Sequence, residues 1–264
     1  MGLLDKQTEM KMVEEYLNGA SSYELARKYG FKTKKSVLDK VRKHGFEPRT
    51  SVEASEAKKT YSGFSMEHID SNFKAYYLGL LLTDGYIIGN DTVGISLVDE
   101  DCISFLAKSI NAHYSTVKRE GNRQDAHRLV LKSKSLVNNL VRLGVVNNKS
   151  LTLQPPQLTE DEEVFIPYII RGMIDGDGWI RKDGNEFFIG SMSRDFIGWT
   201  KYVLERKLFM YDINIHQGNE GIWIARSSLA RNITILKALV YDRPFGMERK
   251  YNRLHNTTEN LQRL

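Results

Sequence analysis

The sequence predicts an α+β fold in which a small all-α domain precedes one αββαββα unit that is used twice. Two observations support this prediction. The first 50 residues carry three short amphipathic helical patterns, and the rest repeats the order helix, two strands, helix, two strands, helix. Such a repeat predicts two halves related by a pseudo-twofold axis. We expect domains at residues 1–48, 70–153 and 160–264, with a polar linker at 49–69.

The three N-terminal helices are expected at about 7–18, 21–30 and 33–44. The second opens with Ser21 three residues before Glu24, which is the spacing of a capping box. The third has a basic face opposite its apolar stripe, made of Lys34, Lys35, Lys40, Arg42 and Lys43. Two short helices joined by a tight turn, the second of them basic, resemble a helix-turn-helix DNA-binding module. A three-helix bundle with solvated lysines is the alternative.

Composition restricts the class of protein. With 41% hydrophobic and 27% charged residues in 264, disordered and fibrous classes are excluded. The formal net charge of +5 fits a polyanionic partner without requiring one. A single cysteine, Cys102, excludes an internal disulfide and a cysteine-based zinc site. No apolar run approaches the ~20 residues of a membrane span, and no signal core opens the chain, so we expect a cytoplasmic protein with no membrane partner. Because one chain carries both halves of the pseudo-twofold repeat, we expect a monomer.

Each repeat starts with an apolar helix that ends in an acidic glycine turn, at residues 73–85 and 165–178. A hairpin follows each helix, around Gly89-Asn90-Asp91 and around Asp183-Gly184-Asn185. Their glycine, asparagine and aspartate content is what tight hairpin turns favour. Amphipathic helices are then expected at about 99–111 and 193–209, followed in each copy by two strands and a final helix.

Each acidic turn is the end of a segment that resembles the LAGLIDADG signature of homing endonucleases and their relatives. These segments are YLGLLLTDG at 77–85 and IRGMIDGDG at 170–178. The first departs at its sixth position, where Leu82 replaces the usual aspartate, but it keeps Gly79 and Asp84. The resemblance covers about 190 residues and implies the LAGLIDADG homing endonuclease fold. A helix that merely ends in an Asp-Gly turn would be the simpler interpretation of either copy alone.

The residues support the same arrangement on physical grounds. Gly79 and Gly172 allow two helices to approach closely, which would bring Asp84 and Asp177 together at the ends of these helices. Two adjacent carboxylates repel one another unless cations neutralise them, and oxygen ligands suit Mg²⁺ or Mn²⁺. We therefore expect the metal at Asp84 and Asp177, with Gly176 and Thr83 as further candidate ligands. The six histidines show no metal-ligand spacing.

The resemblance also implies a basic catalytic residue near the end of the fourth strand of each sheet. Lys132 and Arg226 lie at about those points, and Lys134 remains an alternative in the first copy. The sheets are expected to follow the DNA major groove with alternate side chains. Candidates in the first copy are Tyr86, Ile88, Asn90, Thr92, Lys118, Arg119, Asn122, Arg123 and Gln124. Those in the second copy are Trp179, Arg181, Lys182, Asn185, His216, Gln217 and Asn219.

The sequence therefore predicts a site-specific, divalent-metal-dependent double-strand DNA endonuclease of the homing type. The helix-turn-helix would extend its footprint, and a mobile element, such as an intron or a freestanding phage or bacterial gene, would encode it. An intein is not expected, because the chain begins without a splicing Cys or Ser and ends in Asn-Leu-Gln-Arg-Leu. A DNA-binding transcriptional regulator or an RNA maturase with the same fold is the alternative. The segment Met247–Tyr251 resembles one found at the end of second repeats, but we interpret it as a solvated terminal helix.

Overall fold

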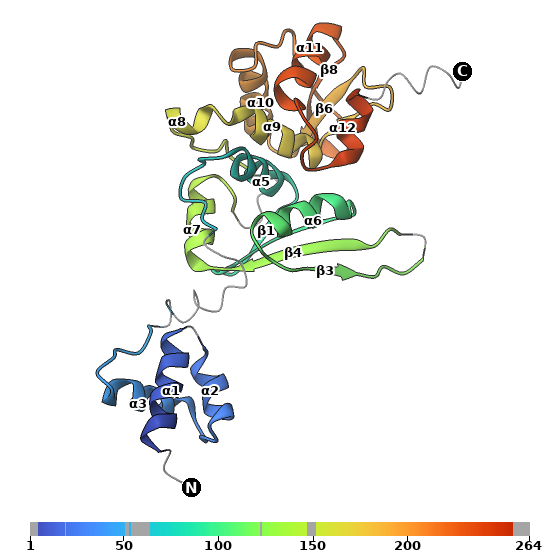
Figure 1. Cartoon of the computed structure of the whole chain (residues 1–264). Coiled ribbons are helices and arrows are strands. Elements are labelled where there is room, and N and C mark those ends of the chain that lie inside the picture. The colour runs from blue at the N-terminus through green and yellow to red at the C-terminus, as the bar shows by residue number, and fades with distance from the viewer. Residues whose placement is uncertain are drawn as a thin grey trace. The chain divides into compact units, whose positions relative to one another are not determined.

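The computed structural model describes residues 5–18, 20–50, 53, 64–121, 123–146 and 152–255. Its internal contacts divide the chain into two compact units, residues 1–60 and 61–264 (Figure 1). Most of the predicted linker, the candidate Asn122 and the last nine residues of the second predicted repeat lie outside the described residues.

The described part of the first unit contains the helices α1 (Lys6–Leu17), α2 (Ser22–Lys28) and α3 (Lys34–Lys43). The predicted capping box is confirmed, because the Ser21 amide donates to Glu24 while the Ser21 hydroxyl caps the first turn of α2. The helices bury one shared apolar cluster, formed by Met12, Val13, Tyr16, Leu25, Ala26, Val37 and Val41. This cluster uses the apolar face of each predicted helix.

The second unit contains the predicted αββαββα order twice. The first repeat comprises α5 (Asn72–Thr83), β1 (Gly85–Ile88), β2 (Thr92–Leu97), α6 (Glu100–Ser109), β3 (Tyr114–Val117), β4 (Ala126–Lys132) and α7 (Lys134–Arg142). After the short α8 (Glu160–Glu163), the second comprises α9 (Ile166–Asp175), β5 (Trp179–Ile180), β6 (Phe187–Ser191), α10 (Arg194–Arg206), β7 (Asn214–Gln217), β8 (Trp223–Ser227) and α11 (Ala230–Ile235). A π-helical turn (Leu236–Val240) and α12 (Glu248–His255) follow.

Each repeat folds its four strands into an antiparallel sheet of the same order. The first sheet has the order β1-β2-β4-β3 and the second β5-β6-β8-β7. Both predicted hairpin turns form, with Gly89 and Gly184 at φ 62° and 72°, the left-handed region that such turns require. Along β4, buried and exposed residues alternate, so one face of the sheet meets the helices and the other is open.

Helices α5 and α9 pack against each other through two glycines. A Cβ atom on Gly79 would lie 2.1 Å from the carbonyl oxygen of Ile169, and one on Gly172 would lie 2.2 Å from that of Tyr76. Real Cβ atoms do not approach so closely, so only glycine permits this contact. The predicted close approach of the two helices is therefore present, and their C-terminal ends meet. No helix in the described part of the chain is both long and apolar enough to cross a bilayer.

Candidate active site and nucleic-acid interface

Asp84 and the loop that carries Asp177 lie together where α5 and α9 end. Asp84 is the C-cap of α5 and is half-buried, while Asp177 is exposed two residues beyond the end of α9. A Cβ on Gly176 would lie 2.7 Å from Oδ2 of Asp84. The Asp84 carboxylate therefore rests against the residue that immediately precedes Asp177. Each aspartate also leads into the first strand of its sheet.

The oxygen atoms at this place fit a hard divalent cation. Mg²⁺ uses one or two carboxylates and completes its coordination with water and phosphate oxygens, so two neighbouring aspartates are a suitable donor set. The part of the chain that the structure describes holds no cluster of three or more His, Cys, Asp or Glu side chains that could bind a metal. The other two predicted ligands have internal partners. Thr83 donates to the carbonyl of Leu80 at 3.0 Å, and the carbonyl of Gly176 accepts from Lys250 at 3.3 Å.

Asp175, the sixth residue of the second signature, is a buried anchor. Its carboxylate accepts hydrogen bonds from the Tyr241 hydroxyl at 2.7 Å, the Tyr76 hydroxyl at 2.8 Å and the Met247 amide at 3.3 Å. Burial raises the pKa of Asp175, and these hydroxyl donors act in the opposite direction. Since the tyrosines come from α5 and from beyond the π-helical turn, Asp175 links the two repeats. Leu82 occupies the corresponding position in the first signature.

The terminal segment Met247–Tyr251 is not the solvated helix that the sequence predicts. Met247 and Lys250 are buried, and the Lys250 ammonium donates to backbone carbonyls around Asp177. Burial lowers the pKa of Lys250 to about 8. The sequence interpretation was wrong because α12 has mostly polar residues, and its buried lysine satisfies main-chain oxygens rather than an apolar surface.

The open faces of the two sheets differ in chemistry. In the first sheet, the ring of Tyr86 covers Gly94, whose Cβ would lie 2.4 Å from Cζ of the tyrosine. In the second, Trp179 stacks on Phe188 with ring centroids 5.5 Å apart. Strand register places the following residues on these faces: Tyr86, Ile88, Thr92, Ser96, Arg128, Val130 and Lys132 in the first, and Trp179, Phe188, Asn214, His216, Ile224 and Arg226 in the second.

Most of the other predicted DNA-binding residues lie in the hairpin loops. Asn90 is in the β1–β2 turn and Lys182 and Asn185 are in the β5–β6 turn, all exposed. The β3–β4 loop carries exposed Lys118, Arg119, Arg123 and Gln124, and the β7–β8 end carries exposed Gln217 and Asn219. Some of these cations have acidic neighbours: Lys118 pairs with Asp125 at 2.8 Å, and Arg181 with Asp183 at 2.7 Å. Such exposed pairs contribute little to stability.

The two predicted basic catalytic residues occupy different places relative to the aspartates. In the strand register, Lys132 stands opposite Thr92, and Thr92 stands opposite Ile88 at the hairpin end of β1. Lys132 therefore lies toward the end of the sheet opposite to Asp84. Arg226 pairs with Phe188, which in turn pairs with Trp179 at the start of β5, and it also contacts Glu186. Lys134 is the first residue of α7.

Arg128 is a basic residue that the sequence analysis did not single out. Gly85 pairs with Ile95, and the β1–β2 register carried one residue further, past the start of β1, reaches Asp84 and Ser96; Ser96 pairs with Arg128. The same extension of the β5–β6 register by two residues reaches Asp177 and Gly190; Gly190 pairs with Ile224, and Ile224 with His216. The first half therefore offers an exposed guanidinium in register with its aspartate, whereas the second offers an isoleucine at that position. Register of this kind depends on hairpin geometry, which the sequence leaves open.

Part of the predicted basic face of α3 turns toward its own unit. The carboxylate of Glu9, a buried residue of α1, forms ion pairs with Lys40 and with Lys43, the latter at 3.1 Å. It also contacts Nε2 of His44 at 3.0 Å. The hydrogen bond from Lys40 is the main cause that lowers the pKa of Glu9 to about 2. Lys34 lies over the ring of Tyr23, and Arg42 pairs with Asp39. Lys34 and Lys35 remain exposed at the start of α3.

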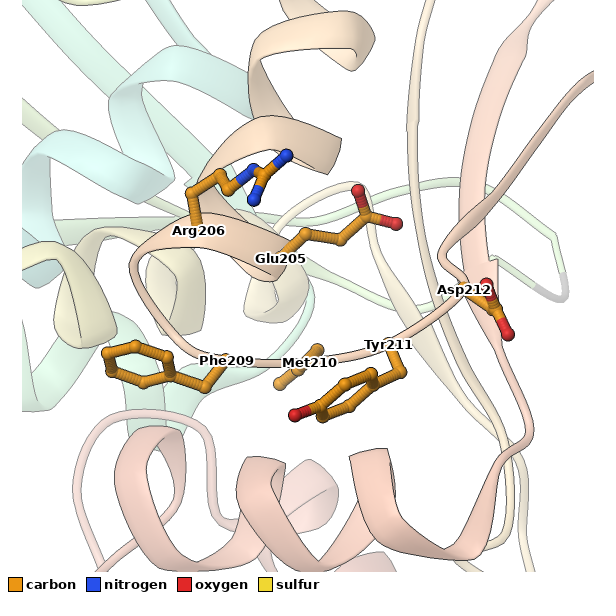
Figure 2. Close-up of a pocket in the computed structure, with 6 residues that line it drawn as sticks. All are labelled: Glu205, Arg206, Phe209, Met210, Tyr211 and Asp212. Atoms are coloured by element: carbon orange, nitrogen blue, oxygen red, sulfur yellow. The ribbon is translucent and has the colours of Figure 1, made fainter.

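A separate surface hollow lies beyond the end of α10 (Figure 2). The side chains around it are Glu205, Arg206, Phe209, Met210, Tyr211 and Asp212. Phe209 has φ 58° and is 69% exposed, and Tyr211 is stacked under Arg231. None of the candidate catalytic, metal or DNA-binding residues lines this hollow, so it is not the site developed above.

The sequence matches no family model, and no curated protein matches it. Solved structures of similar fold include I-DmoI in complex with DNA and Ca, at 18% identity, with a TM-score of 0.46, 72% of this chain covered and 100% of that chain. A variant of I-DmoI in complex with its target DNA in the presence of Mg is 16% identical, with a TM-score of 0.44 and coverages of 67% and 99%. Full-length DUF199/WhiA from Thermatoga maritima is 11% identical, with a TM-score of 0.46. The match covers 75% of this chain, which spans 61% of the length of that protein.

Proposed function

We propose that this protein is a site-specific DNA endonuclease that hydrolyses phosphodiester bonds with divalent metal held by Asp84 and Asp177. The observation that carries the proposal is the contact between the Asp84 carboxylate and Gly176, which sets both aspartates at the junction of the two repeats. An aspartate leads into the edge strand of each sheet, so each half supplies one carboxylate to a common place.

In this proposal the chain's own residues position the substrate and balance charge. Asp84 and Asp177 would hold Mg²⁺ or Mn²⁺, which when bound would polarise a phosphate oxygen and favour ionisation of water. Arg128 supplies positive charge in the row of Asp84, where negative charge develops on the phosphate during hydrolysis. Arg226 lies in the row of Trp179, two residues beyond Asp177.

Double-stranded DNA is the partner that the open faces favour. Exposed cations lie at the tips of the long β3–β4 hairpin and the β5–β6 hairpin, and polar or aromatic side chains lie between them. Basic loops at the ends of a sheet suit the phosphates, and alternate strand residues suit base edges. The faces of the two repeats carry different residues, so the proposed target is long and only partly symmetric. The first unit, with Lys34 and Lys35 exposed on α3, would extend the footprint.

A DNA-binding regulator that does not cleave is the second candidate, and one observation favours it. The row of Asp177 holds Ile224 where the row of Asp84 holds Arg128, so the second half has no basic residue at the corresponding position. A protein that only binds would tolerate such a loss more readily than one that must stabilise charge on both strands.

The decisive experiment incubates the purified protein with complex genomic DNA and either Mg²⁺ or EDTA, and sequences the ends produced. Mg²⁺-dependent ends that accumulate at one long site would support the endonuclease. The matched controls are Asp84→Asn and Asp177→Asn, which keep the size of each side chain and remove its charge. Retained sequence-specific binding with no excess of ends over EDTA would favour the regulator instead.

A further inference from the structure

Lys250 is a buried lysine whose ammonium group lies among the backbone carbonyls of the second signature. Its Nζ donates to the carbonyls of Asp175 and Gly178 at 2.8 Å each, to that of Gly176 at 3.3 Å, and to that of Ile174. The residue is only 3% exposed. These four carbonyls lie on both sides of Asp177, so one side chain ties down both ends of the short loop that carries it.

The aspartate of the first signature is placed differently. Helix α5 continues through Thr83, so Asp84 is itself the helical C-cap, with φ −87° and ψ −4°, and its amide bonds to Leu80 at 2.9 Å. Helix α9 ends one motif position earlier, at Asp175. The amides of Gly176 and Gly178 bond back to the carbonyls of Gly172 at 2.9 Å and Met173 at 3.2 Å, while the carbonyls of this turn meet Lys250. Asp84 is therefore fixed by its own helix, whereas Asp177 lies between two glycines, which restrain the backbone least.

The surroundings explain why a charged lysine is stable in this place. The final carbonyls of a helix lack intrahelical partners and carry partial negative charge, which an ammonium group satisfies. The carboxylates of Asp175 and Asp84 also stabilise the charged form of Lys250. Helix α12 is held from outside the loop, because Arg249 pairs with Asp99 at 2.9 Å and Arg253 donates to the carbonyl of Ile180 at 2.9 Å.

We propose that Lys250 is a positioning residue that fixes the Asp177 loop in the geometry needed to bind metal, by holding the carbonyls on both sides of Asp177 while the glycine amides bond back to α9. The inference rests on the proposed function, in which Asp177 is a metal ligand. Lys250 itself would contact neither metal nor DNA. Groups that hydrogen-bond directly to a metal ligand typically change metal affinity about 10- to 100-fold when removed, and Lys250 acts on Asp177 through the main chain on both sides of it.

The test compares Lys250→Met, which keeps the length of the side chain, and Lys250→Arg, which keeps its charge, with Arg249→Met on the same helix. Arg249→Met removes the pair with Asp99 but touches none of the four carbonyl contacts, and Arg253 still holds α12 through the carbonyl of Ile180. Hydrogen–deuterium exchange at residues 176–178 reports the order of the loop. Electron paramagnetic resonance follows Mn²⁺ binding to the full chain in complex with a selected DNA site. This signal reports the geometry of the metal site.

Lys250→Met is expected to speed exchange in the loop and to raise the half-saturating Mn²⁺ concentration about tenfold or more. Affinity for the DNA site in EDTA should stay within about twofold. Lys250→Arg should restore part of the metal affinity, and Arg249→Met should leave the Mn²⁺ midpoint unchanged. If Lys250→Met fails to fold, the double variant Asp175→Asn/Lys250→Met removes both buried charges and takes its place.

Loop exchange that is the same in Lys250→Met and the wild type would overturn the inference, whatever the activity of the protein. An equal shift of the Mn²⁺ midpoint in Arg249→Met would also overturn it, because docking of α12 alone would then explain the effect. If the wild type binds no Mn²⁺ that depends on Asp177, the proposed function fails first. The role of Lys250 in metal binding then fails with it, even if the loop exchange rises as expected.

Discussion

Gly79 and Gly172 face each other across the contact between α5 and α9, and a Cβ on either would lie 2.9 Å from the Cα of the other. The same contact brings the Asp84 carboxylate against Gly176. The close approach of two backbones therefore sets the spacing of the proposed metal ligands. A change at either glycine should alter stability and metal binding together.

Substitution of Gly172 by alanine should destabilise the second unit by about 3 kcal/mol or more, because the new methyl group meets main-chain atoms of α5 that cannot move independently. The control is Gly198→Ala in α10, where a Cβ would meet nothing within 4 Å. That change should stabilise the protein by about 0.5–1 kcal/mol. Chemical denaturation followed by tryptophan fluorescence measures both, since Trp179, Trp199 and Trp223 all lie in this unit. A small change in the free energy of unfolding for Gly172→Ala would show that the two helices can move apart at little free-energy cost.

Arg128 should matter more for cleavage than Lys132. Arg128→Met is expected to lower the single-turnover rate by at least about tenfold with little change in DNA affinity, because it removes charge in the row of Asp84. Lys132→Met, toward the hairpin end of the same face, should change the rate less. Rates on one selected site with saturating Mg²⁺ decide between them. A larger loss in Lys132→Met would restore the assignment made from the sequence.

The two strands of the target should be cut at unequal rates. Since only the first half has a guanidinium in the row of its aspartate, a nicked intermediate should accumulate before the double-strand break. Time courses on a supercoiled plasmid with one site measure the nicked fraction. Ile224→Arg should reduce this fraction if charge at that position limits the slower cut, and an unchanged fraction would contradict the explanation.

Removal of the residues before about Ser65 should weaken DNA binding and leave metal-dependent cleavage detectable. The first unit would contribute phosphate contacts, so its loss should also lower the salt dependence of the affinity. Fluorescence anisotropy at several salt concentrations tests this, and unchanged affinity would exclude a DNA-binding role for the unit.

Acid should loosen the first unit through Glu9. Its pKa is lowered in the folded state from 4.5 to about 2, so the ionised carboxylate contributes stability above pH 4.5 that is lost as the pH falls toward 2. One pKa unit corresponds to about 1.4 kcal/mol, which sets an upper bound of about 3 kcal/mol. Hydrogen exchange at the buried residues Met12 and Val13 measures the effect. Glu9→Gln should remove this pH dependence.

Local patterns predicted the elements well because each depends on neighbours in sequence. Helix periodicity located the helices, and Gly89 and Gly184 marked the hairpin turns. The paired glycines of the two signatures predicted the helix contact. Relations across the fold were harder. Arg128 becomes a candidate only once the strand register is known, and Lys250 only once a polar helix is seen to return to the end of α9. Lys40 forms an ion pair with the buried Glu9, whereas the sequence alone predicted an exposed cation.

The aromatic residues on the open faces have a consequence for how the protein would meet a duplex. Tyr86 lies flat over a glycine, whereas Trp179 lies over another ring at the corresponding position of the second sheet. The first face therefore carries one ring in this row and the second carries two, because Phe188 stands where the first sheet has Gly94. We expect the distance between the sheet and the base edges to differ between the two halves. A groove of uniform width would then fit one half better than the other. The preferred target would then be set partly by the local width of the duplex, and not only by the identity of its bases.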